Sequence, residues 1–302
     1  MKIMLLNAGS SSLKASVLDT SDGAVVACGQ ADWKRENARY QFDGPEGMTS
    51  VIHKIESGYS SAVQRFINDW EQARLRFFPT ESSPTAVGHR VVHGGPFSSS
   101  VRINADVRLR IADLAELAPL HNPPSLETLE AAEAALPGVP HIAVFDTAFH
   151  STMPPEMYTY PIPDEWTNHW GIRRFGFHGL SHAYCARRAA ELLNRSESGL
   201  RLVICHLGHG CSATAVRDGR SVDTTMGFTP LEGLMMGTRS GSIDPGLLLY
   251  VMQRHDLKPE QLDSALNRNS GLLGVSGFSS DMRELLDAAF AGHKKTRLAI
   301  DM

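Results

Sequence analysis

The sequence of 302 residues has few cysteines and no long apolar run. Its four cysteines are Cys28, Cys185, Cys205 and Cys211, and no two of them form a CxxC pair. We therefore expect a cytoplasmic protein whose cysteines are reduced and mostly buried. No apolar stretch approaches the roughly 18 residues that cross a bilayer. The run after Lys2 is too short for a signal peptide, so no association with a membrane is expected.

An excess of positive charge is also absent. The formal net charge is −4 at pH 7, whereas a general nucleic-acid binder usually carries a basic face. No nucleic-acid partner is therefore expected, and any phosphate site must be a local concentration of cations. With 42% hydrophobic and 21% charged residues, the composition is typical of a globular protein with a true core. The length suits one large domain or two.

Three common site motifs are missing as well. The sequence contains neither GxxxxGK[ST] nor a GxGxxG that follows a strand, which disfavours the P-loop and Rossmann classes of nucleotide site. His178 and His182 are spaced like zinc-binding histidines, but Gly179 stands where HExxH has glutamate, and no third ligand is evident. A zinc site is therefore not expected.

Among the motifs that are present, residues 201–246 are the most informative. Leu202–Cys205 is apolar and β-branched, which predicts a buried strand, and Ser212–Val216 predicts a returning strand. The glycine-rich turn His206–Gly210 between them is expected to adopt positive φ and approach a ligand closely. Converging N–H groups there suit a phosphate, although an ordinary hairpin turn is the alternative. Later glycines surround Arg239, which favours a charged ligand; they are Gly227, Gly233, Gly237 and Gly241.

The same pattern occurs at the start of the chain. Ile3–Leu6 predicts a short strand, Asn7–Ser12 a small polar turn, and Leu13–Leu18 a returning strand. Each hairpin is followed by an Asp-Gly turn, at Asp22-Gly23 and at Asp218-Gly219. Two hairpins of one design, far apart in the sequence, indicate an internally duplicated fold. If the two halves face each other, both turns line one cleft.

Helical periodicity and capping residues predict a series of helices. They cover Ser57–Phe77, Asn104–Leu117, Ser125–Leu136, Leu180–Asn194, Pro245–His255, Pro259–Asn267 and Asp281–Phe290. Ser125 and Ser280 are the expected N-caps of two of these helices. Glycines are expected to break the chain over residues 270–277. The segment Met153–Trp170, rich in proline and aromatic residues, is expected to cross between the halves.

Two charged residues lie at the ends of predicted strands. Arg90 follows the strand that begins near Thr85 and precedes two glycines, so it is either a surface charge or an anion ligand. Asp146 follows the buried strand His141–Phe145. The carboxyl ends of strands are where α/β folds bind ligands, although a capping role for Asp146 is the alternative.

Six stretches of the chain resemble, in the family's order, the motifs of acetate kinases. They are Asn7–Lys14, Gly88–Gly95, Val144–His150, Arg174–Gly179, the hairpin Leu202–Gly219, and Met236–Gly241. The resemblance implies the α/β fold that acetate and sugar kinases share with Hsc70 and actin. This is a duplicated, ribonuclease H-like fold of two domains with a cleft between them. The implied domains are 1–150, for acetate and phosphate, and 151–302, for the nucleotide.

The resemblance also implies a reaction: acetate and ATP give acetyl phosphate and ADP, reversibly, with Mg²⁺ or alternatively Mn²⁺, in a homodimer. The implied catalytic residues are Asp146, His178 and Arg239. The implied substrate-binding residues are Arg90, Val92, Leu120, Phe177 and Pro230, with Val92 on the same face of its strand as Arg90. The implied ATP-binding residues are Lys14, His206, Leu207, Gly208, His209, Gly210, Asp281, Met282 and Arg283, and Asn7 is the implied metal-site residue.

Some features depart from the family pattern. His209 stands where the family has asparagine, and Ser242 where it has aspartate. The sequence ends at Met302 in an apolar helical pattern, without the family's adenosine loop, acidic magnesium ligand and closing helix. We therefore expect an incomplete second domain and a poor kinase. The alternatives are a kinase for propionate or another short carboxylic acid, and a non-catalytic remnant that binds phosphate or a partner.

Overall fold

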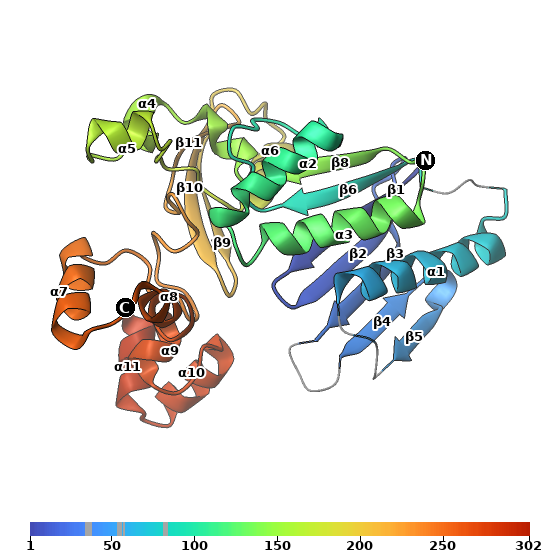
Figure 1. Cartoon of the computed structure of the whole chain (residues 1–302). Coiled ribbons are helices and arrows are strands. Elements are labelled where there is room, and N and C mark those ends of the chain that lie inside the picture. Colours follow the sequence, from blue (N-terminus) through green and yellow to red (C-terminus); the bar gives the residue numbers. More distant parts are fainter. Residues whose placement is uncertain (34–37, 53–55, 57, 81–83) are drawn as a thin grey trace. The chain divides into compact units, whose positions relative to one another are not determined.

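The computed structural model describes residues 1–33, 38–52, 56, 58–80 and 84–302, which divide into two compact units, Met1–Ala148 and Phe149–Met302 (Figure 1). The strands of the first unit are β1 (Lys2–Gly9), β2 (Ser12–Asp19), β3 (Val25–Asp32), β4 (Arg39–Asp43), β5 (Thr49–Ile52), β6 (Ala86–Val91), β7 (Val101–Arg102) and β8 (His141–Phe145). Its helices are α1 (Tyr59–Phe77), α2 (Ala105–Asp113) and α3 (Asn122–Ala135), with short 3₁₀ helices at Pro45–Gly47 and Leu114–Glu116.

The strands of the first unit form one mixed sheet in the order β5-β4-β3-β2-β1-β6-β8-β7. The three strands β1, β6 and β8 are parallel, and their other neighbours pair antiparallel to them. Parallel strands end at the same edge of a sheet, which is where α/β folds bind ligands. Asn7 in β1, Arg90 in β6 and Asp146 just after β8 are therefore brought together at this edge.

Helices α1 and α3 cover one face of this sheet (Figure 1). Buried and less buried residues alternate along β1 and β6, as expected for strands with one covered face. Helix α1 contributes the fully buried side chains of Phe66 and Trp70, which belong to the same buried cluster as Met4 and Leu6 of β1. Each such apolar side chain contributes about 1.5–3 kcal/mol when it is buried. The opposite face carries Asn7 and Arg90, so the core holds the backbone that presents them.

The second unit combines a small sheet with many helices. Its strands are β9 (Arg201–Leu207), β10 (Cys211–Arg217) and β11 (Arg220–Thr224), paired antiparallel in the order β11-β10-β9. Its helices are α4 (Pro155–Tyr158), α5 (Asp164–Asn168), α6 (Gly179–Leu192), α7 (Pro245–His255), α8 (Pro259–Arg268), α9 (Gly271–Ser276), α10 (Met282–Phe290) and α11 (Lys294–Asp301), and a 3₁₀ helix spans Ala148–Thr152. Helix α6 packs against β9, and α11 packs against α9 and α10.

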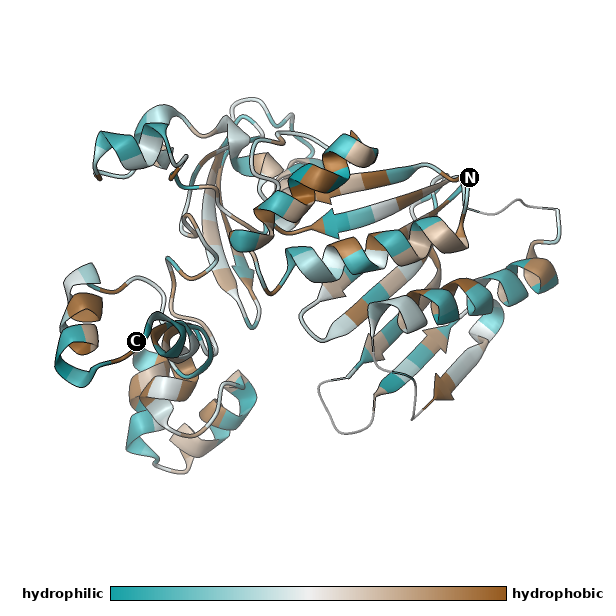
Figure 2. Ribbon diagram, in the orientation of Figure 1, coloured by the Kyte–Doolittle hydropathy of each residue, from teal (hydrophilic) through white to brown (hydrophobic). Residues whose placement is uncertain are grey.

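Residues Leu202–Cys205 form a strand as predicted, but the prediction that this strand is buried is wrong. Strand β9 lies at the edge of its sheet, and every second residue is exposed, including Val203 at 76% and Leu207 at 74%. An apolar run therefore occurs here in a strand with one open face. Cys205 lies on that open face and Cys28 is also exposed, so the expectation of mostly buried cysteines is wrong too. Figure 2 shows further apolar residues along α7, none of which is buried.

The helix starts also differ from prediction. Helix α3 begins at Asn122, and Ser125 lies inside it, where its hydroxyl donates to the carbonyl of His121 at 3.0 Å. Two prolines follow Asn122, and their fixed φ suits the first turn of a helix. The N-cap of α10 is Asp281 rather than Ser280, because its carboxylate accepts from the N–H of Arg283. No helix in the described ranges is both long and apolar enough to span a bilayer.

The glycine-rich and proline-rich segments contain more helix than predicted. Residues 271–276, which were expected to break the chain, form α9, and its end is marked by Gly277 in the left-handed region. Met153–Trp170 contains the short helices α4 and α5, both of which have proline next to their first turn or in it. Proline disrupts the interior of a helix but fits its first turn. This explains why two short helices can begin at prolines in this segment.

Candidate active site

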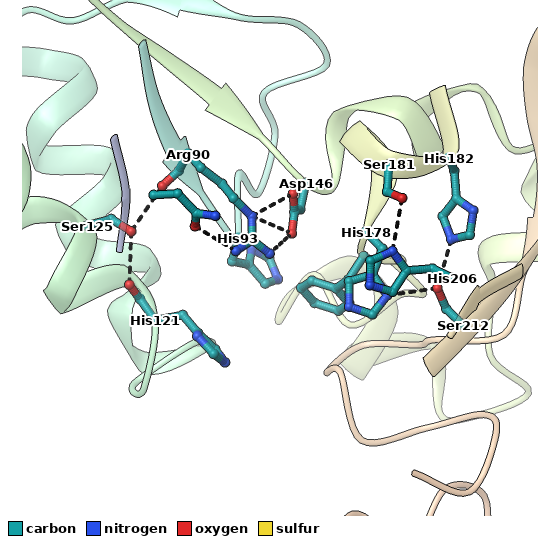
Figure 3. Close-up of polar contacts among 12 residues, drawn as sticks. Arg90, His93, His121, Ser125, Asp146, His178, Ser181, His182, His206 and Ser212 are labelled. Carbon is teal, nitrogen blue, oxygen red and sulfur yellow. Dashed lines mark hydrogen bonds and ion pairs between the residues drawn. The ribbon is translucent and has the colours of Figure 1, made fainter. Parts of the chain in front are cut away.

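The first unit brings Asn7, Arg90 and Asp146 into direct contact (Figure 3 shows the last two). The guanidinium Nε of Arg90 lies 3.1 Å from Asp146 Oδ1, Nη2 donates to Asp146 Oδ2, and Nη1 donates to Asn7 Oδ1 at 3.0 Å. Burial acts to lower the pKa of Arg90, but the charge of Asp146 and the hydrogen bonds to it outweigh this effect and raise it. Asp146 is fully inside the unit, so its charge is balanced by one rigidly held arginine.

This arrangement leaves part of the Arg90 guanidinium available. An arginine has five N–H donors, and the contacts to Asp146 and Asn7 engage one hydrogen on each of the three nitrogens. Two of the five N–H groups therefore remain, and a bidentate pair with a carboxylate requires two. Lys14 is the cross-strand partner of Asn7 and lines with it an open pocket of about 580 Å³ on the same face.

The second unit holds a partly buried arginine without a counter-ion. Burial lowers the pKa of Arg239, and its Nη1 donates to the carbonyl of Pro230 at 3.2 Å. Among the described residues, no carboxylate pairs with this guanidinium. A cation removed from water without a partner is costly, so the site is suited to receive an anion.

His178 lies beside this arginine. A Cβ atom added at Gly210 would lie 3.6 Å from Arg239 Nη1 and 3.7 Å from His178 Nε2, so both side chains border the space over this glycine. His178 is the N-cap of α6 and has a left-handed φ of 59°, which is uncommon outside glycine and is often found at functional sites. The guanidinium of Arg239, the ring of His178 and the backbone of the turn therefore border one small space.

His178 belongs to a cluster of three histidines (Figure 3). The ring of His178 stacks on that of His206 with centroids 4.0 Å apart. His178 Nδ1 and His182 Nε2 lie 2.9 and 2.8 Å from the hydroxyl oxygen of Ser212, and His206 Nδ1 lies 2.9 Å from that of Ser181. Each ring is therefore held by a serine hydroxyl.

A larger open pocket of about 760 Å³ adjoins the glycine-rich turn. It is lined by six residues of the predicted ATP site and by apolar side chains from α9 and α11 and the loop before Gly237. The six are Leu207, Gly208, His209, Asp281, Met282 and Arg283. Its size suits a small organic ligand, and its lining of apolar side chains with a few polar groups is typical of cofactor sites. Within the described residues, no group of three or more His, Cys, Asp or Glu side chains is placed to hold a metal ion.

Comparison with known proteins gives the family. The family model of the acetokinases matches residues 2–302. The chain belongs to the acetokinase family. It is 46% identical to the acetate kinase of Thermoanaerobacterium thermosaccharolyticum over all of this chain and 76% of that protein. It is also 46% identical to the acetate kinase of Rippkaea orientalis over all of this chain and 77% of that protein. The chain thus spans about three quarters of the length of these relatives.

Solved structures agree with this assignment. The chain matches a propionate kinase from Francisella tularensis with a TM-score of 0.90 and 40% identity, over 99% of this chain and 76% of that one. It matches an acetate kinase from Porphyromonas gingivalis with a TM-score of 0.86 and 39% identity, over 100% of this chain and 76% of that one. The α/β fold of the acetate kinases, predicted from the six motifs, is thereby confirmed.

The remaining predicted residues of the acetokinase site lie in different surroundings. Val92 follows the end of β6 at Val91, so the expectation that it continues the alternation of that strand is wrong. Val92 and Phe177 are buried, whereas Leu120 is 41% exposed in the turn before α3. Pro230 contributes its carbonyl to Arg239. Val92 and Leu120 belong to the first unit, and Phe177 and Pro230 to the second.

The reason given for the glycines of the turn needs correction. Gly208 and Gly210 do not have positive φ, so the turn does not require the left-handed region there. A Cβ at Gly237 would lie only 2.8 Å from His209 Nδ1, whereas a Cβ at Gly210 would meet Arg239 and His178 at ordinary contact distances. Backbone conformation is therefore not the reason for Gly208 and Gly210, and close approach to a ligand stays a prediction.

Sequence reasoning missed two residues of this site. His182 was considered only as a metal ligand, and Ser212 only as the start of a strand, yet both contact the network of His178. The spacing of His178 and His182 was a usable signal, because residues four apart share one face of a helix. Nothing in the sequence indicated the role of Ser212, because its partners come from another element.

Proposed function

We propose that this acetokinase transfers the γ-phosphoryl group of ATP to acetate, giving acetyl phosphate and ADP, and that it also catalyses the reverse reaction. The observation that carries the proposal is the partly buried Arg239, which has no carboxylate partner among the described residues and borders one space with His178 and the backbone of Gly210. Phosphoryl transfer depends mainly on positioning and on neutralising the charge of the phosphoryl oxygens. Two donors of this kind beside a backbone turn supply that neutralisation.

The acceptor is a carboxylate, held by Arg90. Its two remaining N–H groups would bind the acetate oxygens, and Asp146 would keep the guanidinium in place. Acetate is ionised at pH 7, by analogy with Asp and Glu, so no general base is required. Asp146 in its pair with Arg90 therefore acts as an orienting group in this proposal, and the apolar side chains Val92, Leu120, Phe177 and Pro230 would surround the methyl group.

In the transfer, an acetate oxygen attacks the γ-phosphorus, and the bond from that phosphorus to the bridging oxygen of ADP breaks. The electron pair leaves with ADP, so no proton has to move. Arg239 and His178 would stabilise the negative charge on the phosphoryl oxygens, which is worth several kcal/mol in a site closed to water. Lys14 and the turn from His206 to Gly210 would bind the other phosphates, and the pocket beside Asp281 would hold the nucleoside.

The proposal includes Mg²⁺. This ion is usually bound through one or two carboxylates together with phosphate oxygens and waters. Asn7 Oδ1 would supply one oxygen donor to such an ion, and Asp146, which pairs with Arg90, would orient the groups around it. The ion would neutralise phosphate charge when bound. From the family resemblance, we further propose that the protein acts in the cytoplasm as a homodimer.

The test is formation of acetyl phosphate, trapped with hydroxylamine, from ATP, Mg²⁺ and acetate. We expect turnover that depends on acetate, with higher kcat/KM for acetate than for propionate or butyrate. ATP consumption that is independent of any carboxylic acid would contradict the proposal. A preference for propionate would instead assign the protein as a propionate kinase, the activity named for the Francisella relative. The two acids differ by one methylene, which changes binding by only about 1–3 kcal/mol.

A further inference from the structure

The buried hydroxyl of Ser212 lies between two histidine rings of the second unit (Figure 3). Its oxygen is 2.9 Å from His178 Nδ1 and 2.8 Å from His182 Nε2. Ser212 and His182 are both fully buried. A hydroxyl has one proton, so it donates to only one of the two rings, and the other ring must donate to it. The proton positions of the two rings are therefore linked through Ser212.

His182 sets the direction of this chain of hydrogen bonds. Burial, and then the neighbouring rings of His150 and His206, lower the pKa of His182 to about 4, so the ring is neutral at pH 7 and carries one proton. Its Nδ1 is buried without a hydrogen-bonding partner in the described part of the chain. A proton there would be an orphaned donor, at a cost of about 1–3 kcal/mol. The proton therefore belongs on Nε2, and His182 donates to Ser212.

The consequence for His178 follows directly. Ser212 accepts from His182, and the one other contact recorded for its hydroxyl among the described residues is His178 Nδ1. The buried proton of Ser212 is therefore donated to this nitrogen, which must be unprotonated to accept it. The proton of a neutral His178 then lies on Nε2, the nitrogen that borders the space over Gly210 beside Arg239.

We propose that Ser212 is a positioning residue that holds His178 in the tautomer with its proton on Nε2. His178 then acts as a neutral hydrogen-bond donor to the transferred phosphoryl group. The identity of this ligand rests on the proposed function. The tautomer does not, because it is a property of the protein without a ligand.

The tautomer is measured directly by long-range ¹H–¹⁵N spectra of the protein labelled at its 13 histidines. The signals of His178 are assigned by their absence in His178→Gln. At pH 7.5 we expect His178 to be protonated on Nε2 and bare on Nδ1. A proton on Nδ1, or on both nitrogens, would overturn the proposal.

Variants separate positioning from a structural role. Ser212→Ala should give a mixture of His178 tautomers and lower kcat by about tenfold, the value of one hydrogen bond, with KM for both substrates within about twofold. Ser212→Thr keeps the hydroxyl and should behave as the wild type. Thr214→Val is the matched control. It removes another buried hydroxyl from the same face of β10, one that bonds to Thr224, and should leave His178 unchanged.

The outcomes are distinct. If Ser212→Ala leaves both the tautomer and kcat as they are in Thr214→Val, Ser212 does not position His178. If Ser212→Ala does not fold, the spectra of the wild type and Ser212→Thr still decide the tautomer. A protein with the expected tautomer that makes no acetyl phosphate contradicts the proposed function alone. An active protein with His178 protonated on Nδ1 contradicts only the inference on Ser212.

Discussion

At the scale of single residues, Arg239 is the side chain whose removal should affect the reaction most. It is a desolvated cation without a carboxylate partner among the described residues, so its charge is available to the phosphoryl oxygens. We expect Arg239→Ala to lower kcat/KM by at least about a hundredfold, or about 2.7 kcal/mol. Arg239→Lys should recover only part of this loss, because a lysine keeps the charge and loses the planar fork.

The control for this prediction is Arg188→Ala. Arg188 is half exposed and pairs with Glu191 on the surface of α6, so its removal should leave kcat/KM unchanged. Steady-state kinetics with acetate and ATP measure both variants. If Arg239→Ala retains wild-type turnover, Arg239 has no part in the site.

The role of a residue was predictable from the sequence only where a short local motif contains that residue. The motifs identified Arg90, His178 and Arg239 as candidate site residues, because each lies in a glycine-rich stretch. The bidentate pairing of Arg90 with Asp146 was not predicted, since these residues are separated by 56 positions and meet only through the pairing of β6 with β8. The same limit applies to Ser212.

At the scale of elements, Arg174 connects two segments of the second unit. Its Nη1 lies within hydrogen-bonding distance of the carbonyls of Thr224, Thr225 and Met226, and its Nη2 donates to Glu232 at 2.8 Å. The guanidinium thereby holds the loop that follows β11 against the segment that precedes α6.

We expect Arg174→Ala to lower the free energy of unfolding by about 2–4 kcal/mol, because it leaves a partly buried carboxylate and several carbonyls without their donor. Arg188→Ala breaks an exposed ion pair and should leave the free energy of unfolding nearly unchanged. Urea unfolding of both variants, followed by circular dichroism, makes the comparison. Equal stabilities would mean that the contacts of Arg174 contribute no more than a surface pair.

Element types were predicted better than element ends and burial. Helix α1 was predictable from the sequence because its apolar residues have a strong helical periodicity, which forms the buried stripe from Ala62 to Ala73. The start of α3 was missed because prolines were interpreted as a loop, although they also suit a first helical turn. The exposure of β9 was missed because a short apolar run does not reveal which element covers each of its faces.

At the scale of the whole molecule, the family and the α/β fold were predicted correctly from six motifs in order, and comparison with known proteins confirmed both. Order along the chain is informative because the motifs are spread over both units, from β1 to the loop before α7. The boundary between the units, between Ala148 and Phe149, depends on packing that no single motif records.

Both units contain buried histidines that are neutral when folded, and this determines how stability depends on pH. Burial lowers the pKa of His93 in the first unit and of His182 in the second to about 4. Burial and the paired ring also lower the pKa of His89, whose Nε2 lies 2.9 Å from His141 Nδ1. The unfolded chain binds these protons below about pH 6.5, and the folded chain does not. The free energy of unfolding is therefore unaffected by these histidines above about pH 6.5, and it decreases as the pH falls from there towards 4.

The buried pair in the first unit gives the sharpest test of this dependence. For each histidine that stays neutral in the fold, the loss between pH 7.5 and pH 5 is about 2 kcal/mol. Replacing the pair, as His89→Leu with His141→Leu, should therefore reduce the acid loss by at least about 2 kcal/mol, even if the variant is less stable at pH 7.5. His255→Gln, at an exposed position, should leave the acid loss unchanged. Urea unfolding at the two pH values measures each difference. An acid loss in the double variant as large as that of the wild type would show that other groups, and not this pair, control stability in acid.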